Sequence, residues 1–279
     1  MRDDETFLSE LELWPLVQIQ RAAHIQKQVQ PSAPEINVKR SAMQPSAARP
    51  SARSEAINTQ PPPNTDVRKP VPSQAKTELI IDPLRAPKIA ALDWLALQNA
   101  VSACADCGLC KQRKQAVFGS NNATASTSAT WMFVGDAPGL EDDAQGEPFL
   151  GEVGQLVDAM LHALGLKRGD QVFLSSAVKC RPPGNRTPTA DEIATCLPYL
   201  QRQIALVQPK IIIAFGKIAA QALTGLDAPI MQLRGTVHHF NNTAIIATFN
   251  SAFLLRNGAE KAKVWDDLLL AKKTLESLN

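Results

Sequence analysis

Five cysteines are the residues of this 279-residue chain whose types and spacing are most suited to chemistry. Cys104, Cys107 and Cys110 recur at two-residue gaps, and Cys180 and Cys196 follow much later with fifteen residues between them. A thiolate site needs soft ligands that converge from loops, and four cysteine thiolates can hold either an iron–sulfur cluster or Zn²⁺. The spacing predicts a metal centre without choosing between the two. Buried thiols that bind no metal are the alternative.

A second candidate site lies in residues 134–156, which read VGDAPGLEDDAQGEPFLGEVGQL. The apolar run at 131–134 that leads into this stretch is typical of a buried strand. The turn at 135–139 is stiff, because Pro fixes its own φ while Gly permits tight geometry. Glycines and a proline then hold Phe149. These features predict a pocket for a small molecule or a base at the carboxyl end of a strand, with an ordinary strand-to-helix connection as the alternative.

The elements that would position these residues alternate between strand and helix. Such alternation indicates a three-layer α/β fold, in which helices cover both faces of a mostly parallel central sheet. Residues 210–215 are almost wholly apolar, as a central parallel strand requires. We expect strands near 130–135, 171–178, 209–215 and 244–249, and helices near 89–104, 152–165, 189–206, 216–224 and 258–276.

Composition limits the classes of function. An apolar content of 44% supports a sizeable core, whereas a formal net charge of +2 means that any DNA-facing surface must be a local basic patch. No apolar run approaches the roughly 20 residues that a transmembrane helix needs, so we expect no membrane span. The first six residues are too acidic for a secretory signal, so a cytoplasmic protein is expected. In that reducing compartment the cysteines would be ligands or buried thiols rather than disulfides.

Residues 1–30 form a candidate docking segment. Leu8, Leu11 and Trp14 suit one face of a helix, which Pro15 would interrupt. A segment that folds against a protein partner is one interpretation, and a frayed terminus is the other. The apolar pattern that ends in Trp14 loosely resembles the start of the psi subunit of the bacterial replicative clamp loader, which implies a partner in the replisome.

Proline marks the next segment as a linker. Eleven of the chain's 20 prolines fall between positions 31 and 87, among Ser, Ala and Gln. This composition does not bury enough apolar surface to offset the loss of chain entropy, so residues 31–86 are predicted to be disordered. The globular domain is expected over residues 87–279.

Two motifs resemble those of the iron–sulfur (type 4) uracil-DNA glycosylases. The first comprises Gly135-Asp136-Ala137-Pro138-Gly139, Glu141-Asp142, Gly146, Pro148-Phe149-Leu150-Gly151 and Gly154, with the acidic pair one place early. The second is Lys179-Cys180-Arg181-Pro182-Pro183-Gly184-Asn185-Arg186, followed by Cys196. The resemblance covers roughly residues 88–279. It implies a uracil-DNA glycosylase-like domain that removes uracil from DNA by hydrolysing the N-glycosidic bond, in base excision repair.

The same resemblance implies a [4Fe–4S] cluster, with zinc as the second choice. The implied ligands are Cys104, Cys107, Cys180 and Cys196. Leu109 and Arg113 keep the family register when Cys104 and Cys107 form the first pair, which leaves Cys110 as a spare thiol that competes with Cys104. The cluster's implied role is structural, because no step of base excision needs an electron.

The resemblance also assigns roles at the pocket. Asp136 would orient water and favour the oxocarbenium-like sugar, while Phe149 stacks on a uracil flipped out of DNA. Gly135 and Ala137 would line the base, and Asn250 with backbone groups would stabilise its departing anion.

DNA contacts are implied in two places. Arg181 and Arg186 would meet phosphates beside the cluster. Leu254, Leu255 and Arg256 keep the family pattern of a loop that wedges into the base stack and grips a phosphate. An ordinary apolar pair at a helix start is the alternative for the two leucines.

Two positions depart from the family pattern. Ser176 stands where the family has an Asn that hydrogen-bonds the base, and a hydroxyl does not present an amide's paired donor and acceptor, so preference for uracil over cytosine is in question. Asn250 replaces the His of the late His-Pro-Ser-x-Leu-Leu-Arg motif, as in mismatch-type relatives, and can still donate a neutral hydrogen bond. A glycosidase-like pair at Glu141 and Asp142 is a competing but disfavoured idea.

Two hypotheses of function follow. The first is a DNA N-glycosylase, weakened by the two substitutions. The second is a non-catalytic DNA-binding or replisome adaptor that kept the fold and docks through residues 1–29, since fold alone does not fix function. The enzyme is favoured, because Asp136, Phe149 and the implied cluster ligands all remain.

Overall fold

The structure is a computed structural model that describes residues 82–120, 129–169 and 171–278. The candidate docking segment (1–30) and most of the predicted linker (31–86) lie outside these residues, so both stay predictions. Helix α3 (Arg85–Ala90) begins two residues before the expected start of the domain at residue 87. Arg85 anchors this helix through a 2.8 Å ion pair with Asp106 and a bond to the carbonyl of Thr195.

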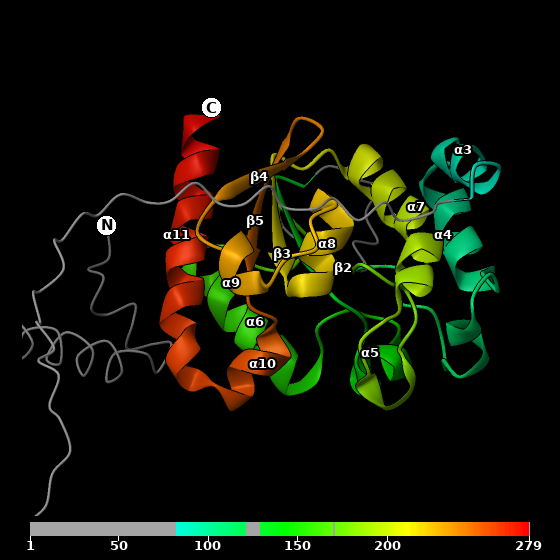
Figure 1. The fold of residues 1–279 in the computed structure, drawn as a ribbon, viewed down its shortest axis with the longest axis horizontal. Helices are drawn as coiled ribbons and strands as arrows, with labels where there is room; N and C mark the ends of the chain where they lie inside the picture. The colour runs from blue at the N-terminus through cyan, green and yellow to red at the C-terminus, as the bar shows by residue number, and fades with distance from the viewer. Residues whose placement is uncertain (1–81, 121–128, 170, 279) are drawn as a thin grey trace, which may run out of the picture. The chain divides into compact units, whose positions relative to one another are not determined.

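Five strands form one sheet at the centre of the domain (Figure 1). In spatial order they are β2 (Val172–Ser176), β1 (Trp131–Gly135), β3 (Ile211–Phe215), β5 (Thr243–Thr248) and β4 (Val237–Phe240). The first four are parallel, and β4 pairs antiparallel with β5. Every residue of β1, β2 and β3 is buried, as expected of central parallel strands covered on both faces.

Helices cover both faces of the sheet and make three layers (Figure 1). Side chains alternate along β1, so Met132 and Val134 join the core on one face while Trp131 and Phe133 join the core on the other. The first core also contains residues of α4 (Trp94–Ala103), α7 (Ala190–Val207) and α8 (Lys217–Thr224). The second contains residues of α6 (Gly151–Ala163), α10 (Ser251–Arg256) and α11 (Lys261–Ser277). The predicted three-layer α/β fold is confirmed.

The departures from the predicted elements are local. The single helix expected over 89–104 is divided, because Asp93 is the N-cap of α4 and accepts the Ala96 N–H at 2.8 Å. Strand β4 was not expected, since two histidines interrupt its apolar pattern. The remaining short elements are α5 (Leu140–Gln145), α9 (Ile230–Leu233), and the 3₁₀ turns η1 (Gly108–Lys111), η2 (Pro183–Asn185) and η3 (Gly258–Glu260). Within the described ranges, no helix has both the length and the apolar character needed to cross a membrane.

The carboxyl ends of four strands meet at one edge of the sheet. Gly135 at the end of β1 pairs with Ser176 of β2 on one side and Phe215 of β3 on the other, and Phe215 pairs with Thr248 of β5. The residues that directly follow these strands therefore converge, although they are far apart in sequence. Open parallel sheets bind ligands at this kind of edge.

Candidate active site and thiol cavity

Asp136 is the first residue after β1, and two donors hold its carboxylate. Oδ1 accepts the backbone N–H of Ala219, in the first turn of α8, at 2.8 Å, and Oδ2 accepts the side-chain amide of Asn250 at 2.8 Å. Gly216 provides the space, because its φ is +110° and a Cβ there would lie 2.3 Å from Oδ2. The fold thus brings together the two residues that were predicted to be catalytic.

The surroundings of Asp136 raise the pKa of its carboxyl group. Burial raises the pKa of the Asp136 carboxyl to about 6, while the backbone N–H groups of Ala219 and Ile218 and the Asn250 amide oppose the rise by stabilising the charged form. A carboxylate with this pKa is mostly ionised at pH 7 and is still basic enough to accept a proton from water. These properties suit a general base.

Asn250 uses both ends of its amide. Nδ2 donates to Asp136, and Oδ1 accepts the N–H of Ala252 at 2.9 Å as the N-cap of α10. The orientation of the amide is fixed, because a carboxylate only accepts and a backbone N–H only donates. Since an amide nitrogen carries two N–H donors, the second can serve a ligand at the strand edge.

Phe149 lies at the same edge in a backbone conformation that few residues adopt. Its φ is +56°, and such strained positions cluster at ligand and active sites. A Cβ on Gly135 would lie 2.9 Å from the ring, whose centroid is 6.0 Å from that of Phe215 in an edge-to-face contact. Arg168, which no sequence motif marks, donates to the carbonyls of Pro148 and Phe149. The ring is thereby held against the end of β1.

Ser176 and Ala137 complete the predicted pocket lining. Ser176 ends β2 and is 3% exposed, and its Oγ would lie 3.8 Å from a Cβ on Gly135. Ala137 follows Asp136 and is partly buried against the core shared with α7 and α8. A serine at the end of β2 offers one short hydroxyl where a base edge presents paired donors and acceptors.

The acidic residues that follow the turn belong to α5, and among them Asp142 has a structural role. Both oxygens of Asp142 accept backbone N–H groups, from Gly139 at 2.9 Å and from Leu150 at 2.8 Å. These bonds close the loop that carries Phe149. Because Asp142 is fully engaged, the glycosidase-like pair of Glu141 and Asp142 receives no support from the geometry.

Helix α10 corrects the prediction that Leu254 and Leu255 both wedge into DNA. Leu254 is fully buried in the core next to α6 and α11, whereas Leu255 is 41% exposed and Arg256 is exposed. Successive residues of an α-helix point about 100° apart, so the two leucines cannot share one exposed face. Of these three residues, Leu255 and Arg256 are exposed and available to a nucleic acid.

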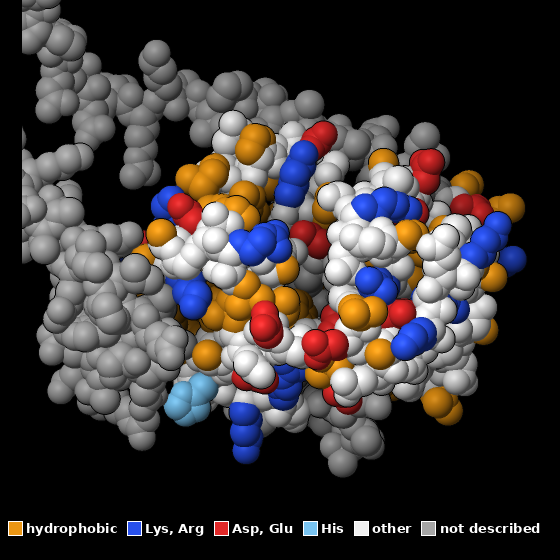
Figure 2. Space-filling model, turned by 90° about the horizontal axis from the view of Figure 1, so that it is seen from below, with side chains coloured by type: hydrophobic (Ala, Val, Ile, Leu, Met, Phe, Trp, Pro, Cys, Tyr) orange, Lys and Arg blue, Asp and Glu red, His pale blue; other side chains and the backbone are white. Residues whose placement is uncertain are grey.

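The two arginines after β2 are tethered within their own segment. Arg186 forms a bidentate pair with Glu192 at 2.8 and 2.7 Å, and Arg181 donates to Asn185 at 2.7 Å. Each guanidinium keeps further donors, since it carries five N–H groups. Figure 2 shows the face where the strands end, with Lys and Arg side chains distributed around a hollow that holds apolar and acidic groups. The positive charges on this face are therefore dispersed around the strand edge and are mixed with acidic side chains.

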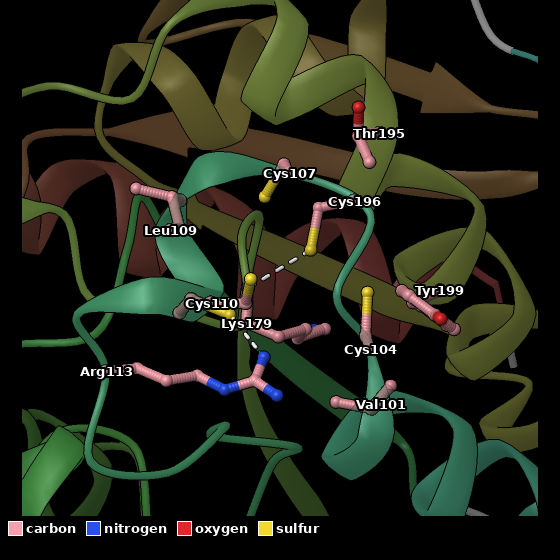
Figure 3. A pocket seen from close by; sticks show the side chains of 11 residues that line it. Val101, Cys104, Cys107, Leu109, Cys110, Arg113, Lys179, Thr195, Cys196 and Tyr199 are labelled. Atoms are coloured by element: carbon pink, nitrogen blue, oxygen red, sulfur yellow. Dashed lines mark hydrogen bonds between the residues drawn. The ribbon is translucent and has the colours of Figure 1, made fainter.

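All five cysteines line one cavity beside α7 (Figure 3). The segment from the end of α4 through η1 supplies Cys104, Cys107 and Cys110, the loop after β2 supplies Cys180, and α7 supplies Cys196. The predicted ligands thus converge, and so does the spare thiol. In the part of the chain that is described, no three ligating side chains are close enough to hold a metal ion as they stand.

The surroundings of the thiols fit a thiolate-bound cluster. Arg113 donates to Cys180 Sγ at 2.9 Å, and the backbone N–H of Lys179 donates to Cys196 Sγ at 3.2 Å. Burial raises the pKa of Cys196 to about 12, and it also raises the pKa of Cys180 despite the opposing effect of Arg113. Buried thiols of this kind ionise when a metal takes the place of the proton.

Lys179 lies at the border between the thiol cavity and the strand edge. It is 1% exposed, and its Nζ donates to Ser175 Oγ at 2.6 Å, Ser176 O at 2.7 Å and Gln203 Oε1 at 2.7 Å. Burial lowers the pKa of its ammonium to about 8, and the nearby thiol groups act in the opposite direction. The sequence marks Lys179 only as a motif residue, because no local pattern reveals that a lysine will be buried.

Comparison with known proteins identifies several type-4 uracil-DNA glycosylases as relatives. The family profile described as the Uracil DNA glycosylase superfamily matches residues 123–269. A type-4 uracil-DNA glycosylase of Pyrobaculum aerophilum is 38% identical over 187 residues, which cover 64% of this chain and 93% of that relative. Type-4 uracil-DNA glycosylases of Saccharolobus solfataricus and Thermotoga maritima are 37% and 35% identical, over 67% and 64% of this chain and 87% and 93% of their own lengths.

Proposed function

Because this chain belongs to the uracil-DNA glycosylase superfamily and, within it, to the type-4 family, we propose that it removes uracil from DNA by hydrolysing the N-glycosidic bond. One observation carries the proposal: the Asp136 carboxylate stands at the strand edge with a pKa of about 6, bonded to Asn250 and α8. Hydrolysis at a sugar carbon needs a base that can orient and deprotonate water, and a carboxylate with this pKa at the strand edge suits that task.

Each pocket residue has a part in the proposed reaction. The target nucleotide leaves the base stack, since its glycosidic bond is out of reach inside a duplex. Phe149 stacks on the flipped base. Asp136 accepts a proton from the attacking water, and its negative charge favours the oxocarbenium-like sugar. Asn250 orients Asp136 and offers its second N–H to the oxygen of the departing base.

DNA contacts in the proposal come from both sides of the strand edge. Leu255 takes the wedging role alone, and Arg256 beside it meets a phosphate. Arg181 and Arg186 approach the backbone from the segment after β2, using donors that their internal bonds leave over.

The proposal includes a [4Fe–4S] cluster held by four thiolates, with Zn²⁺ as the second choice. The ligands are Cys104, Cys107, Cys180 and Cys196. The cluster would join the segment after α4 to the loop after β2 and to α7, and it supplies a cross-link rather than a chemical step. Cys110 lines the same cavity and remains the spare thiol. Thiolate ligands need a reducing compartment, so we place the activity in the cytoplasm.

Cys180→Ala should remove most of the iron. Protein purified without oxygen should contain about four irons per chain and be brown, and the substitution deletes a buried ligand. Iron and sulfide analysis measures the loss. Cys110→Ala is the matched control and should keep the wild-type iron content. Stoichiometric zinc without iron, or full iron in Cys180→Ala, would show that the ligand assignment is wrong.

Purified protein should release free uracil from uracil-containing DNA, single-stranded or double-stranded, with a pH profile set by Asp136. The base must be ionised, so the rate should be level above its pKa of about 6. Below pH 6 the rate should fall about tenfold per pH unit, because the protonated carboxyl does not accept a proton from water. Quantifying released base between pH 4.5 and 8 tests both statements.

The control for this assay is DNA without uracil, at each pH. Retained DNA binding below pH 6 would show that the loss concerns the chemical step and not the complex. A rate that rises as the pH falls through 6 would contradict the role given to Asp136. The adaptor hypothesis depends on residues 1–29, which lie outside the described residues, and no observation favours it.

A further inference from the structure

Lys179 is a buried cation that the proposed reaction does not use. It is 1% exposed, and none of the ion pairs within the described ranges involves it. Its three hydrogen-bond partners, Ser175 Oγ, Ser176 O and Gln203 Oε1, are all formally neutral. An isolated charge inside a protein is unfavourable unless a counter-charge compensates it.

The hydrogen-bond network around Lys179 is fully satisfied by the ordinary charged form of lysine. Ser176 O only accepts, and Gln203 Oε1 faces Lys179 because Nε2 donates to the carbonyl of Phe118 at 2.8 Å. The Ser175 hydroxyl has acceptors of its own in Gln203 Oε1, at 3.0 Å, and the carbonyl of Phe118, which leaves its oxygen free to accept from Nζ. An ammonium has three N–H donors, one for each of these three oxygen atoms, so none of its donors is left without a partner.

The thiol cavity is the place where a counter-charge can arise. Lys179 lines this cavity together with all five cysteines (Figure 3), and its own backbone N–H donates to Cys196 Sγ. Cys180 is its neighbour in the chain. Four thiolates around a [4Fe–4S] core leave a net negative charge on the cluster. A negative cluster is thus the missing partner of a buried ammonium.

The other cations at this cavity differ from Lys179. Arg85 is paired with the carboxylate of Asp106 at 2.8 Å. Arg113 donates to Cys180 Sγ but is only partly buried, so solvent also screens its charge. Each is compensated without any ligand in the cavity. Lys179 is buried and has no carboxylate partner among the described residues, so its charge is the one most sensitive to what the cavity holds.

We propose that Lys179 is a positioning residue whose ammonium is the buried counter-ion of the iron–sulfur cluster and couples that cluster to the end of β2. The inference rests on the cluster assignment of the proposed function. Through Ser175 and Ser176, the same ammonium holds the strand end that lines the base pocket. A charged group that lies next to the ligands of a cluster affects how firmly the protein retains the iron. It also affects the reduction potential of the cluster.

Three substitutions test the charge separately from the packing. Lys179→Met removes the ammonium at similar length. Gln203→Glu keeps the lysine and places a carboxylate next to Nζ. The new negative charge neutralises the ammonium without removing it. Ser175→Ala removes one acceptor but leaves the charge, and it is the matched control. All three are compared as holoenzymes purified without oxygen.

Lys179→Met and Gln203→Glu should both shift the midpoint potential of the cluster to more negative values than wild type. They should also speed the loss of iron to a chelator and the bleaching by ferricyanide by about 10–100-fold, the range typical for losing a second-sphere partner. Ser175→Ala should stay close to wild type in both measurements. Gln203→Glu decides the result if Lys179→Met does not fold.

Iron-loaded variants with wild-type potentials and bleaching rates would overturn the inference and leave the proposed function intact. A large effect of Ser175→Ala, equal to that of Lys179→Met, would assign the network a purely structural role and would also overturn it. Wild-type protein that releases uracil but contains no iron would overturn the cluster assignment and this inference together, while sparing the glycosylase activity.

Discussion

Asp136→Asn should lower the rate of uracil release by about 10²–10⁴-fold, the range typical for the loss of a general acid or base. The substitution removes the carboxylate that accepts hydrogen bonds from Asn250 and from the first turn of α8. Because both neighbours of the carboxylate are donors, the new amide nitrogen meets a donor in either orientation and one of the two bonds is lost. The rate should also lose its pH dependence between 5 and 7, which a single-turnover assay can measure.

Two matched variants separate the base from its surroundings. Asp136→Glu keeps a carboxylate and should retain more activity than Asp136→Asn, although its longer side chain must fit beside Gly216. Glu141→Gln removes a carboxylate from the exposed side of α5 and should leave the rate unchanged. Equal losses in Glu141→Gln and Asp136→Asn would revive the idea of an acid pair.

A different outcome would favour the adaptor hypothesis. If wild type and Asp136→Asn are equally inert while both still bind DNA, the glycosylase proposal fails. Deleting residues 1–29 should then remove a protein partner while leaving the affinity for DNA unchanged. A deletion that changes neither would exclude the adaptor as well.

The fold could be predicted from sequence because its central strands have nearly continuous apolar character. Residues 210–215 predicted β3 closely, and the run before Gly135 predicted β1. Strand β4 escaped prediction, since its residues alternate between exposed and partly buried at the sheet margin and include two histidines. An edge strand pairs with a single neighbouring strand and is less buried, so its sequence shows a weaker apolar pattern than that of a central strand.

The sequence predicted part of the site. Residues whose roles depend on nearby sequence could be predicted, whereas contacts between residues far apart in the chain could not. Asp136 and Phe149 stand in one motif next to one strand, so a local pattern marks them. The bond from Asn250 to Asp136 spans 114 positions and exists because β1, β3 and β5 end in register. No short stretch contains that information.

The incorrect prediction for Leu254 is explained by the direction in which its side chain points from α10. The motif that holds Leu254 and Leu255 does not say which of them faces the core, because the six residues of α10 are too few to show a periodic apolar pattern. The core next to α6 and α11 decides it. Lys179 escaped notice for a related reason, since its burial depends on Gln203, which lies on another element.

Ser176→Asn combined with Asn250→His should raise the rate of uracil release by up to about 10²-fold over wild type, because removing one oxyanion donor typically costs 10²–10³ and Asn250 already recovers part of that. Ser176 has one hydroxyl at a position that is 3% exposed, and an amide there would restore a paired donor and acceptor for the base edge. Asn250→His would add a donor that can carry charge.

Ser176→Asn and Asn250→His differ in their expected effect on the stability of the fold. Asn250 is the N-cap of α10, and losing a cap of this kind typically destabilises a protein by about 0.5–2 kcal/mol, so rates must be compared per folded molecule. Ser176→Ala controls for the hydroxyl and should not raise the rate. Discrimination should change as well, since Ser176→Asn adds the amide that separates uracil from cytosine. A double variant no faster than wild type, in a protein where Asp136→Asn still abolishes release, would mean that contacts to the base do not limit the reaction and that Ser176 and Asn250 are full replacements for the family residues.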